Sequence, residues 1–211
     1  TLSKNGKIQG QLYVVSAPSG AGKTSLVKAL VDSTDDLAVS VSHTTRAMRP
    51  GEIDGVNYHF VSAERFCEIR DQGGFFEWAQ VFDNFYGTSR QSVTDQLDEG
   101  VDVILEIDWQ GAAQVKQQMP NAIAIFILPP STAALRERLT GRGQDESSVI
   151  ERRMQSARDE MSHYGKADFL VLNDNFDAAL LDLESVIKSQ RLSQRHQSQR
   201  LTSVIADLLG E

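Results

Sequence analysis

The stretch from Tyr13 to Leu30 reads YVVSAPSGAGKTSLVKAL. An apolar run, which we predict to be a buried strand over 11–16, stops at a cluster of small residues, and a helical pattern follows from Thr24 to Asp32. The loop between them carries little side-chain bulk and ends in one lysine and one hydroxyl. A strand, a glycine-rich loop and a helix in this order form a setting in which backbone N–H groups bind phosphate.

The segment APSGAGKT, Ala17 to Thr24, fits the phosphate-binding loop pattern, with alanine where the strictest form has glycine. Gly20 and Gly22 permit backbone angles closed to other residues and let N–H groups approach an anion. We expect Lys23 to reach the β- and γ-phosphates and the Thr24 hydroxyl to bind Mg²⁺. A glycine-rich turn that binds nothing would have no use for Gly-Lys-Thr. The loop therefore indicates a nucleoside triphosphate, without saying what is done with it.

The composition restricts the classes of partner. The chain has 211 residues, 40% of them hydrophobic, which suits one compact domain. A formal net charge of −8 argues against broad binding to nucleic acid or acidic membranes. The longest apolar runs fall far short of the ~20 residues of a membrane helix, and TLSKNGKIQG at the start lacks the apolar part of a signal peptide. The single cysteine, Cys67, leaves no internal disulfide and favours a cytoplasmic location.

Three more continuous apolar runs predict the fold class. They are VDVILEID at 101–108, AIAIFIL at 122–128 and FLVLN at 169–173. Such runs are typical of parallel strands buried on both faces, and helical patterns separate them. We therefore predict an α/β fold with a parallel central sheet. Shorter strands are expected at 39–42, 58–61 and 75–82, helices at 62–72, 89–99, 131–140 and 146–162, and a turn at DNFYGTS, 83–89.

The C-terminal part is predicted to be helical. Apolar residues from Phe176 to Ile187 indicate a docked helix, and a polar, basic stretch follows. Beyond it, apolar residues recur at helical spacing: Leu201, Val204, Ile205, Leu208 and Leu209. This tail could pack back on the domain or bury its apolar stripe in a homo-oligomer, and the sequence leaves both open.

A second informative stretch is SVSHTTRAMRPGEIDGVNYHFV, 40–61. Arg46 and Arg49 lie three residues apart in a loop, where two guanidinium groups can bind one phosphate through paired hydrogen bonds. Glu77 in FFEWAQ and Tyr86 in FYGTS follow further along.

Together these segments resemble the guanylate kinase family. The matching pieces run in family order from Leu12 to about Asp174, and LEIDWQGA with the long tail resembles the bacterial members: SAPSGAGKTS, VSHTTRAMRPGE, NYHFV, FFEWAQV, FYGTS, LEIDWQGA, FILPPS, RLTGRG and LND. The resemblance implies transfer of the γ-phosphoryl group of Mg·ATP to GMP or dGMP, in purine nucleotide metabolism and GMP recycling. It also implies a phosphate-loop three-layer fold in a single domain, with an inserted mixed α/β GMP-binding lobe and a helical lid. The expected parts are a core at about 10–40, 95–134 and 165–190, the lobe at 41–94, the lid at 135–164 and the tail at 190–211.

The resemblance also implies roles for individual residues. The ATP-binding set is Ala17, Pro18, Ser19, Gly20, Ala21, Gly22, Lys23, Thr24, Ser25, Arg138 and Asn173. The GMP-binding set is Ser42, Arg46, Arg49, Tyr58, Glu77, Tyr86, Thr88, Glu106 and Asp108. The catalytic set is Lys23, Arg46, Asp108, Arg142 and Arg153, and Thr24 is the expected Mg²⁺ ligand. Where the family often has LDID, this chain has LEID, so Glu106 offers a longer carboxylate.

Two other functions compete with a guanylate kinase. Related domains serve as non-catalytic protein-binding modules, but those tend to lose residues equivalent to Lys23, Thr24, Arg46 and Arg49, all present here. A kinase for another nucleoside monophosphate is the second alternative. Glu77 argues against it, because one carboxylate can accept both the ring N–H and the amino group of guanine, and adenine lacks that pair.

Overall fold

The computed structural model describes residues 8–81, 83–141 and 147–210. Its central sheet has the strand order β2-β7-β1-β8-β9, and every neighbouring pair is parallel. The strands are β1 (Leu12–Ser16), β2 (Leu37–Val39), β7 (Asp102–Glu106), β8 (Ile123–Leu128) and β9 (Phe169–Leu172). The predicted α/β class with a parallel central sheet is confirmed.

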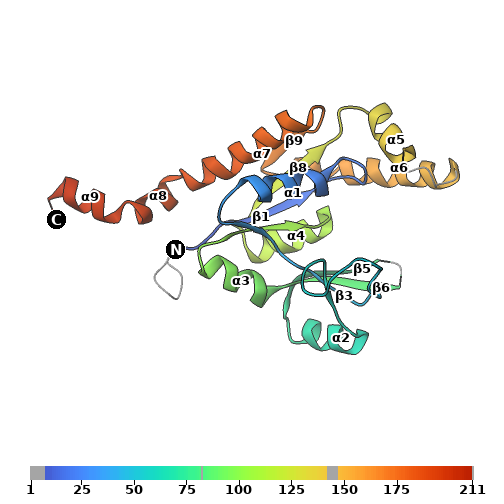
Figure 1. The fold of residues 1–211 in the computed structure, drawn as a ribbon, viewed down its shortest axis with the longest axis horizontal. Coiled ribbons are helices and arrows are strands. Elements are labelled where there is room, and N and C mark those ends of the chain that lie inside the picture. Colours follow the sequence, from blue (N-terminus) through green and yellow to red (C-terminus); the bar gives the residue numbers. More distant parts are fainter. Residues whose placement is uncertain (1–7, 82, 142–146, 211) are drawn as a thin grey trace.

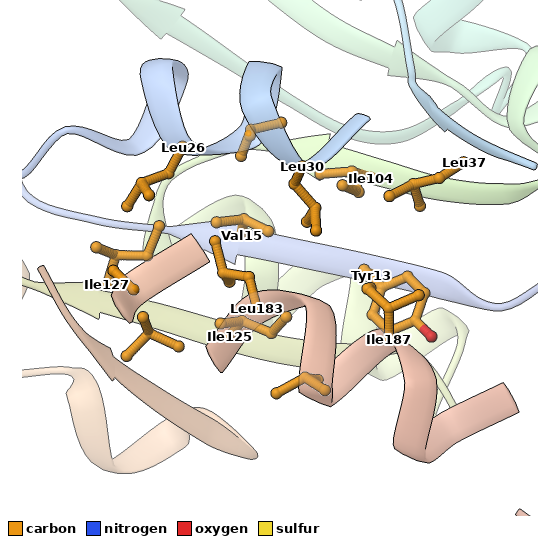
Figure 2. Packing of buried hydrophobic residues seen from close by; sticks show 14 of the residues in the cluster. Tyr13, Val15, Leu26, Leu30, Leu37, Ile104, Ile125, Ile127, Leu183 and Ile187 are labelled. Carbon is orange, nitrogen blue, oxygen red and sulfur yellow. The ribbon is translucent and has the colours of Figure 1, made fainter. Parts of the chain in front are cut away.

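Helices cover both faces of this sheet because its strands bury side chains on both faces. Tyr13 and Val15 point to the face covered by α1 (Lys23–Ser33) and α7 (Phe176–Arg191). Figure 2 shows this packing, with Leu26 and Leu30 of α1 and Leu183 and Ile187 of α7 meeting the strands. The alternate residues, Leu12 and Val14, pack on the other face in a cluster that includes α3 (Arg90–Asp98) and α4 (Trp109–Gln118). All four loops that leave the carboxyl ends of β1, β7, β8 and β9 therefore meet at one edge.

A second sheet, of order β4-β3-β6-β5, lies below the first in Figure 1. Its strands are β3 (His43–Thr44), β4 (His59–Phe60), β5 (Phe75–Val81) and β6 (Asn84–Ser89), and α2 (Ala63–Asp71) packs beside them. The turn predicted over 83–89 is wrong, because 84–89 is a strand paired with β5. Gly87, which suggested a turn, lies where a Cβ would come within 3.1 Å of the rings of Phe66 and Phe75. The glycine makes room for aromatic packing across the strand. The strand predicted at 39–42 is also displaced, since pairing covers 37–39 and 43–44 instead.

Two helices beyond β8 form a small unit with a core of its own. They are α5 (Thr132–Thr140) and α6 (Ser147–Met161), joined through Leu135, Leu139 and Met154 among other buried side chains. A single 3-10 turn, η1 (Tyr164–Lys166), leads from α6 to β9. Leu135 and Leu139 also lie against Gly20, so this unit packs on the glycine-rich loop.

The chain ends in two short helices, α8 (Gln194–Arg200) and α9 (Thr202–Leu209). Figure 1 shows them continuing outward from α7, away from the central sheet. None of the described residues of α9 is buried, and Leu208 is 77% exposed. The apolar stripe thus does not pack back on the domain. A search over the described residues finds no helix that combines the length and the apolarity of a membrane span.

Candidate active site

The glycine-rich loop has the backbone that its sequence predicts. Gly20 and Gly22 have φ values of 89° and 93°, the left-handed region that side chains disfavour. A Cβ on Gly22 would also lie 2.4 Å from the Asn173 amide nitrogen. That amide donates a 2.7 Å hydrogen bond to the carbonyl of Ala21, so Asn173 helps to hold the loop in this conformation. Both Ala21 and Asn173 are buried, away from the space above the loop.

A cavity of about 480 Å³ opens above the loop. Its wall contains every predicted ATP-binding residue of the loop except Ala21: Ala17, Pro18, Ser19, Gly20, Gly22, Lys23, Thr24 and Ser25. The predicted residues Asp108 and Arg138 also line it, and so does Glu160, which was not predicted. We call this space the loop cavity. Asp108 is fixed there because its carboxylate caps α4, accepting a 2.8 Å hydrogen bond from the N–H of Gly111.

Lys23 interacts electrostatically with three carboxylates at or near this cavity. Burial lowers the pKa of its ammonium group, and the carboxylates of Glu106, Glu160 and Asp108 act in the opposite direction. Acidic neighbours therefore stabilise a cation that burial alone would disfavour. A bound phosphate would supply negative charge at the same place.

Two predicted arginines from α5 and α6 contact the loop. Arg138 donates a 3.0 Å hydrogen bond to the carbonyl of Asn173, and Arg153 donates a 3.1 Å bond to the hydroxyl of Ser19. Arg142, the third arginine expected in this group, lies outside the described residues.

A second cavity, of about 620 Å³, lies on the other side of Lys23 and Thr24, which line both spaces. We call it the acceptor cavity. Three residues of the predicted GMP-binding set line it: Ser42, Tyr58 and Glu106. The Thr24 hydroxyl donates a 3.2 Å hydrogen bond to the Glu106 carboxylate, so a hydroxyl and a carboxylate face each other at the junction of the cavities.

Arg46 is held by a residue that the sequence analysis did not single out. Its guanidinium group makes paired hydrogen bonds of 2.7 and 3.1 Å to Glu52, and this carboxylate raises the pKa of Arg46. Glu52 also accepts a 2.7 Å bond from the backbone N–H of Arg49. The Arg46 guanidinium lies 5.5 Å from the ring centroid of Tyr58, which in turn contacts the Tyr86 ring at 6.0 Å. These residues form one group, whereas the side chain of Arg49 is exposed.

Glu77 and Thr88 form a buried pair on the neighbouring strands β5 and β6. The Thr88 hydroxyl donates a 2.5 Å hydrogen bond to Glu77, which is 7% exposed. Burial raises the pKa of the Glu77 carboxyl, the hydrogen bond from Thr88 opposes this shift, and the charge of Asp108 adds to it. The other carboxylate oxygen faces Gly111 at the start of α4, where a Cβ would lie 3.1 Å away. Neither Glu77 nor Thr88 is part of the wall of the two cavities.

Glu160 is a second residue that sequence reasoning missed. It lines the loop cavity from the last turn of α6, and its pKa is raised by burial and by the charge of Asp108. The charge of Lys23 and the backbone N–H of Ser19 act in the opposite direction. No motif identified it, because a glutamate in an amphipathic helix is ordinarily a solvent-facing residue.

Comparisons with known proteins agree on one family. The guanylate kinase family model matches residues 9–190. The chain is 57% identical over 201 residues to the guanylate kinase of Pseudomonas fluorescens (strain Pf0-1), covering 95% of this chain and 98% of that protein. It is 58% identical to that of Saccharophagus degradans with the same coverage. The crystal structure of guanylate kinase from Anaplasma phagocytophilum superposes with a TM-score of 0.72 at 31% identity, over 90% of both chains.

Proposed function

Because the chain belongs to the bacterial guanylate kinase family, we propose that its two adjoining cavities transfer the γ-phosphoryl group of ATP to GMP, giving ADP and GDP. The loop cavity takes the triphosphate of ATP and the acceptor cavity takes GMP or dGMP. The observation that carries this assignment is that Lys23 and Thr24 line both spaces. Phosphoryl transfer needs little covalent help from the protein, but it needs donor and acceptor in line around a cation.

On the donor side, the loop N–H groups and Lys23 bind the β- and γ-phosphates. Arg138, Arg142 and Arg153 add positive charge to the equatorial oxygens of the group in transfer. The contacts of Arg138 and Arg153 with the loop support this role, since both guanidinium groups already lie at its edge. Asn173 acts indirectly, by holding the Ala21 carbonyl and with it the curvature of the loop.

The residues at the junction fit a magnesium ion. The Thr24 hydroxyl, the Glu106 carboxylate and the nearby Asp108 carboxylate are oxygen ligands of the kind that Mg²⁺ prefers. When bound with ATP, the ion neutralises charge on the phosphates. These three residues would hold the ion, and they would also orient the acceptor phosphate relative to Lys23.

On the acceptor side, Arg46, Arg49, Tyr58 and Tyr86 bind the GMP phosphate. The grouping of Arg46 with the two tyrosine rings supports this, and the Arg46 guanidinium exchanges part of its contact with Glu52 for the phosphate. The segment 41–94 is then the GMP-binding lobe, and 135–164 is the lid.

Guanine recognition falls to Ser42, Glu77 and Thr88. Both oxygens of the buried Glu77 carboxylate accept the paired N–H donors of guanine, and one of them also keeps its hydrogen bond from the Thr88 hydroxyl. A base without that donor pair leaves a buried carboxylate unpaired, which is costly.

The single cysteine and the exposed tail bear on the location and the assembly of the enzyme. We propose a cytoplasmic location, where GMP and ATP are available, consistent with a single cysteine. We also propose that the exposed stripe of α9 is buried in a homo-oligomer. An apolar patch of this kind at the end of a chain is typical of an interaction surface.

The proposal is tested by replacing Lys23. We expect Lys23→Ala to lower the turnover of GMP by ~10²-fold or more, because transition-state charge loses its nearest cation, while the far-ultraviolet circular dichroism and melting temperature stay close to wild type. Lys188→Ala, which removes an exposed lysine from α7, is the matched control. Full activity of Lys23→Ala would show that the loop does not bind the transferred phosphate.

A further inference from the structure

A third cavity lies outside the site described so far, between α4, the end of β1, β8 and the segment that joins α6 to β9. It has a volume of about 260 Å³. Trp109, Ala112, Ala113 and Lys116 line it from one face of α4, at the spacing that places side chains on one side of a helix. We call it the lid-base cavity, since His163, Lys166 and Ala167 close it where α6 leads into β9.

The size of the lid-base cavity comes from small side chains. Protein interiors pack as densely as organic crystals, and voids larger than a water molecule are few. Here four alanines stand where a bulkier residue would fill the space: Ala112, Ala113, Ala124 and Ala167. The space is therefore accessible to a small molecule of about 14 non-hydrogen atoms rather than to a cofactor.

One wall of the cavity is aromatic and rigid. The rings of Trp109 and His163 stack at a centroid distance of 3.4 Å with an interplanar angle of 15°. Phe126 of β8 adds a second aromatic surface. Because His163 and the Lys166 ammonium already lie on the Trp109 ring, the ring of Phe126 is the aromatic surface available to a guest. A flat ring favours a planar aromatic guest over a branched aliphatic one.

The rim carries an excess of positive charge. Lys116 makes a 2.7 Å ion pair with Asp168, so these two charges offset each other. Lys166 places its ammonium group 4.7 Å from the Trp109 ring, and no acidic partner for it is found among the described residues. The charge of Lys166 is thus left over at the mouth of the cavity and suits a monoanion.

The floor of the cavity has an unmet hydrogen bond. Ser16, the last residue of β1, lines it and is 4% exposed. Its hydroxyl has no hydrogen-bond partner in the described part of the chain. A buried hydroxyl without a partner costs stability, so a polar atom on a guest would be favourable there.

We propose that the lid-base cavity is a second ligand site, which binds a small planar aromatic anion with its ring beside Phe126 and its charge toward Lys166. It lies apart from both nucleotide cavities, although its wall begins one residue after Asp108. Binding there does not require transfer activity, so the two proposals stand or fall separately.

The test uses 2-naphthalenesulfonate as the probe and isothermal titration calorimetry on the full chain, with saturating GMP and ADP so that nucleotide cavities are filled. We expect one site with a Kd on the order of 0.1 mM, the affinity that about 14 non-hydrogen atoms support. Ala113→Leu fills the space and should weaken binding at least ~10-fold, in line with the contact area lost. Ala178→Leu, at an exposed position on α7, is the matched control and should bind as wild type.

A second variant separates charge from shape. Lys166→Gln should weaken binding of 2-naphthalenesulfonate several-fold and leave the affinity for the neutral 2-naphthol unchanged. Turnover of GMP and the melting temperature of each variant establish that the chain is folded. The proposal is overturned if the probe fails to bind wild type, if nucleotides displace it, or if Ala113→Leu binds it as tightly as the control does.

Discussion

At the residue scale, burial of the Glu77 carboxylate supports its proposed selection of guanine but lowers the stability of the folded chain. Its carboxyl has a pKa raised above 4.5 by burial. Between the unfolded and folded pKa values the folded chain binds more protons, so stability falls as pH rises through this range. Above its raised pKa, the ionised carboxylate is therefore a destabilising group. It persists because the proposed recognition of guanine requires two acceptor oxygens.

We expect Glu77→Gln to melt at a higher temperature than wild type at pH 7, and to lose much of its preference for GMP over AMP. In wild type, the KM for GMP should rise as pH falls through the raised pKa of Glu77, while in Glu77→Gln this dependence should be absent. Differential scanning calorimetry and initial rates with both nucleotides check this. Unchanged selectivity in the variant would mean that the base is read elsewhere.

The residues that the sequence could identify are those fixed by a local motif. The loop from Ala17 to Thr24 needs only the strand before it and the helix after it. Glu52 and Glu160 were not identified, because the importance of Glu52 lies in how its own loop folds and that of Glu160 in contacts with distant residues. The Glu52 carboxylate matters only once the loop folds it against Arg46, and Glu160 only once α6 lies over the loop.

At the scale of elements, the same distinction separates the two sheets. The central strands are continuous apolar runs, because both of their faces are buried, and the sequence pattern identifies them directly. The sequence of β6 predicts a turn, because Asp83, Asn84 and Gly87 are residue types that favour turns. Its strand conformation depends on pairing with β5 and on Phe85 stacking against Phe66 at 5.4 Å, which local propensity does not contain.

Helix α6 leads to a prediction about the loop cavity. It places the Glu160 carboxylate in a space proposed to bind a triphosphate, where the two would repel each other. We expect Glu160→Gln to bind ATP several-fold more tightly than wild type, because the change removes the negative charge and leaves the shape of the side chain nearly unchanged. Fluorescence titration with a labelled ATP analogue measures this.

Asp159→Asn, which removes the same charge from the neighbouring position, is the control for a general effect of net charge. Weaker ATP binding by Glu160→Gln would instead mean that the carboxylate helps to hold Lys23 or the Ser19 backbone in place for the nucleotide.

At the scale of the whole molecule, a net charge of −8 repels the anionic substrates, which need positive charge where they bind. Positive charge for phosphate is concentrated locally, in Lys23, Lys28 and Arg138 of the two cavity walls and in Arg153, which contacts the loop, so a strongly acidic protein can still bind nucleotides. For the same reason, a net charge that argues against broad binding to nucleic acid is compatible with nucleotide substrates.

The tail gives a prediction at this scale. Removing 201–211 takes away the exposed stripe that includes Val204 and Leu208. We expect full-length protein to be a homo-oligomer by light scattering coupled to size exclusion, and the truncated protein to contain fewer subunits with its kinase activity retained. Leu208→Asp should act in the same direction. The same number of subunits in the full-length protein, the truncated protein and Leu208→Asp would show that the tail does not mediate assembly.

The measurement that tests the central claim most directly is ADP formation from Mg·ATP with GMP, dGMP, AMP, CMP and dTMP supplied one at a time. We expect rapid turnover with GMP and dGMP and at least ~10²-fold less with the others, because only guanine pairs both of its donors with Glu77. Comparable turnover of AMP or a pyrimidine nucleotide would contradict the assignment of the base site. Folded protein that binds GMP and transfers nothing would contradict the assignment of the two cavities.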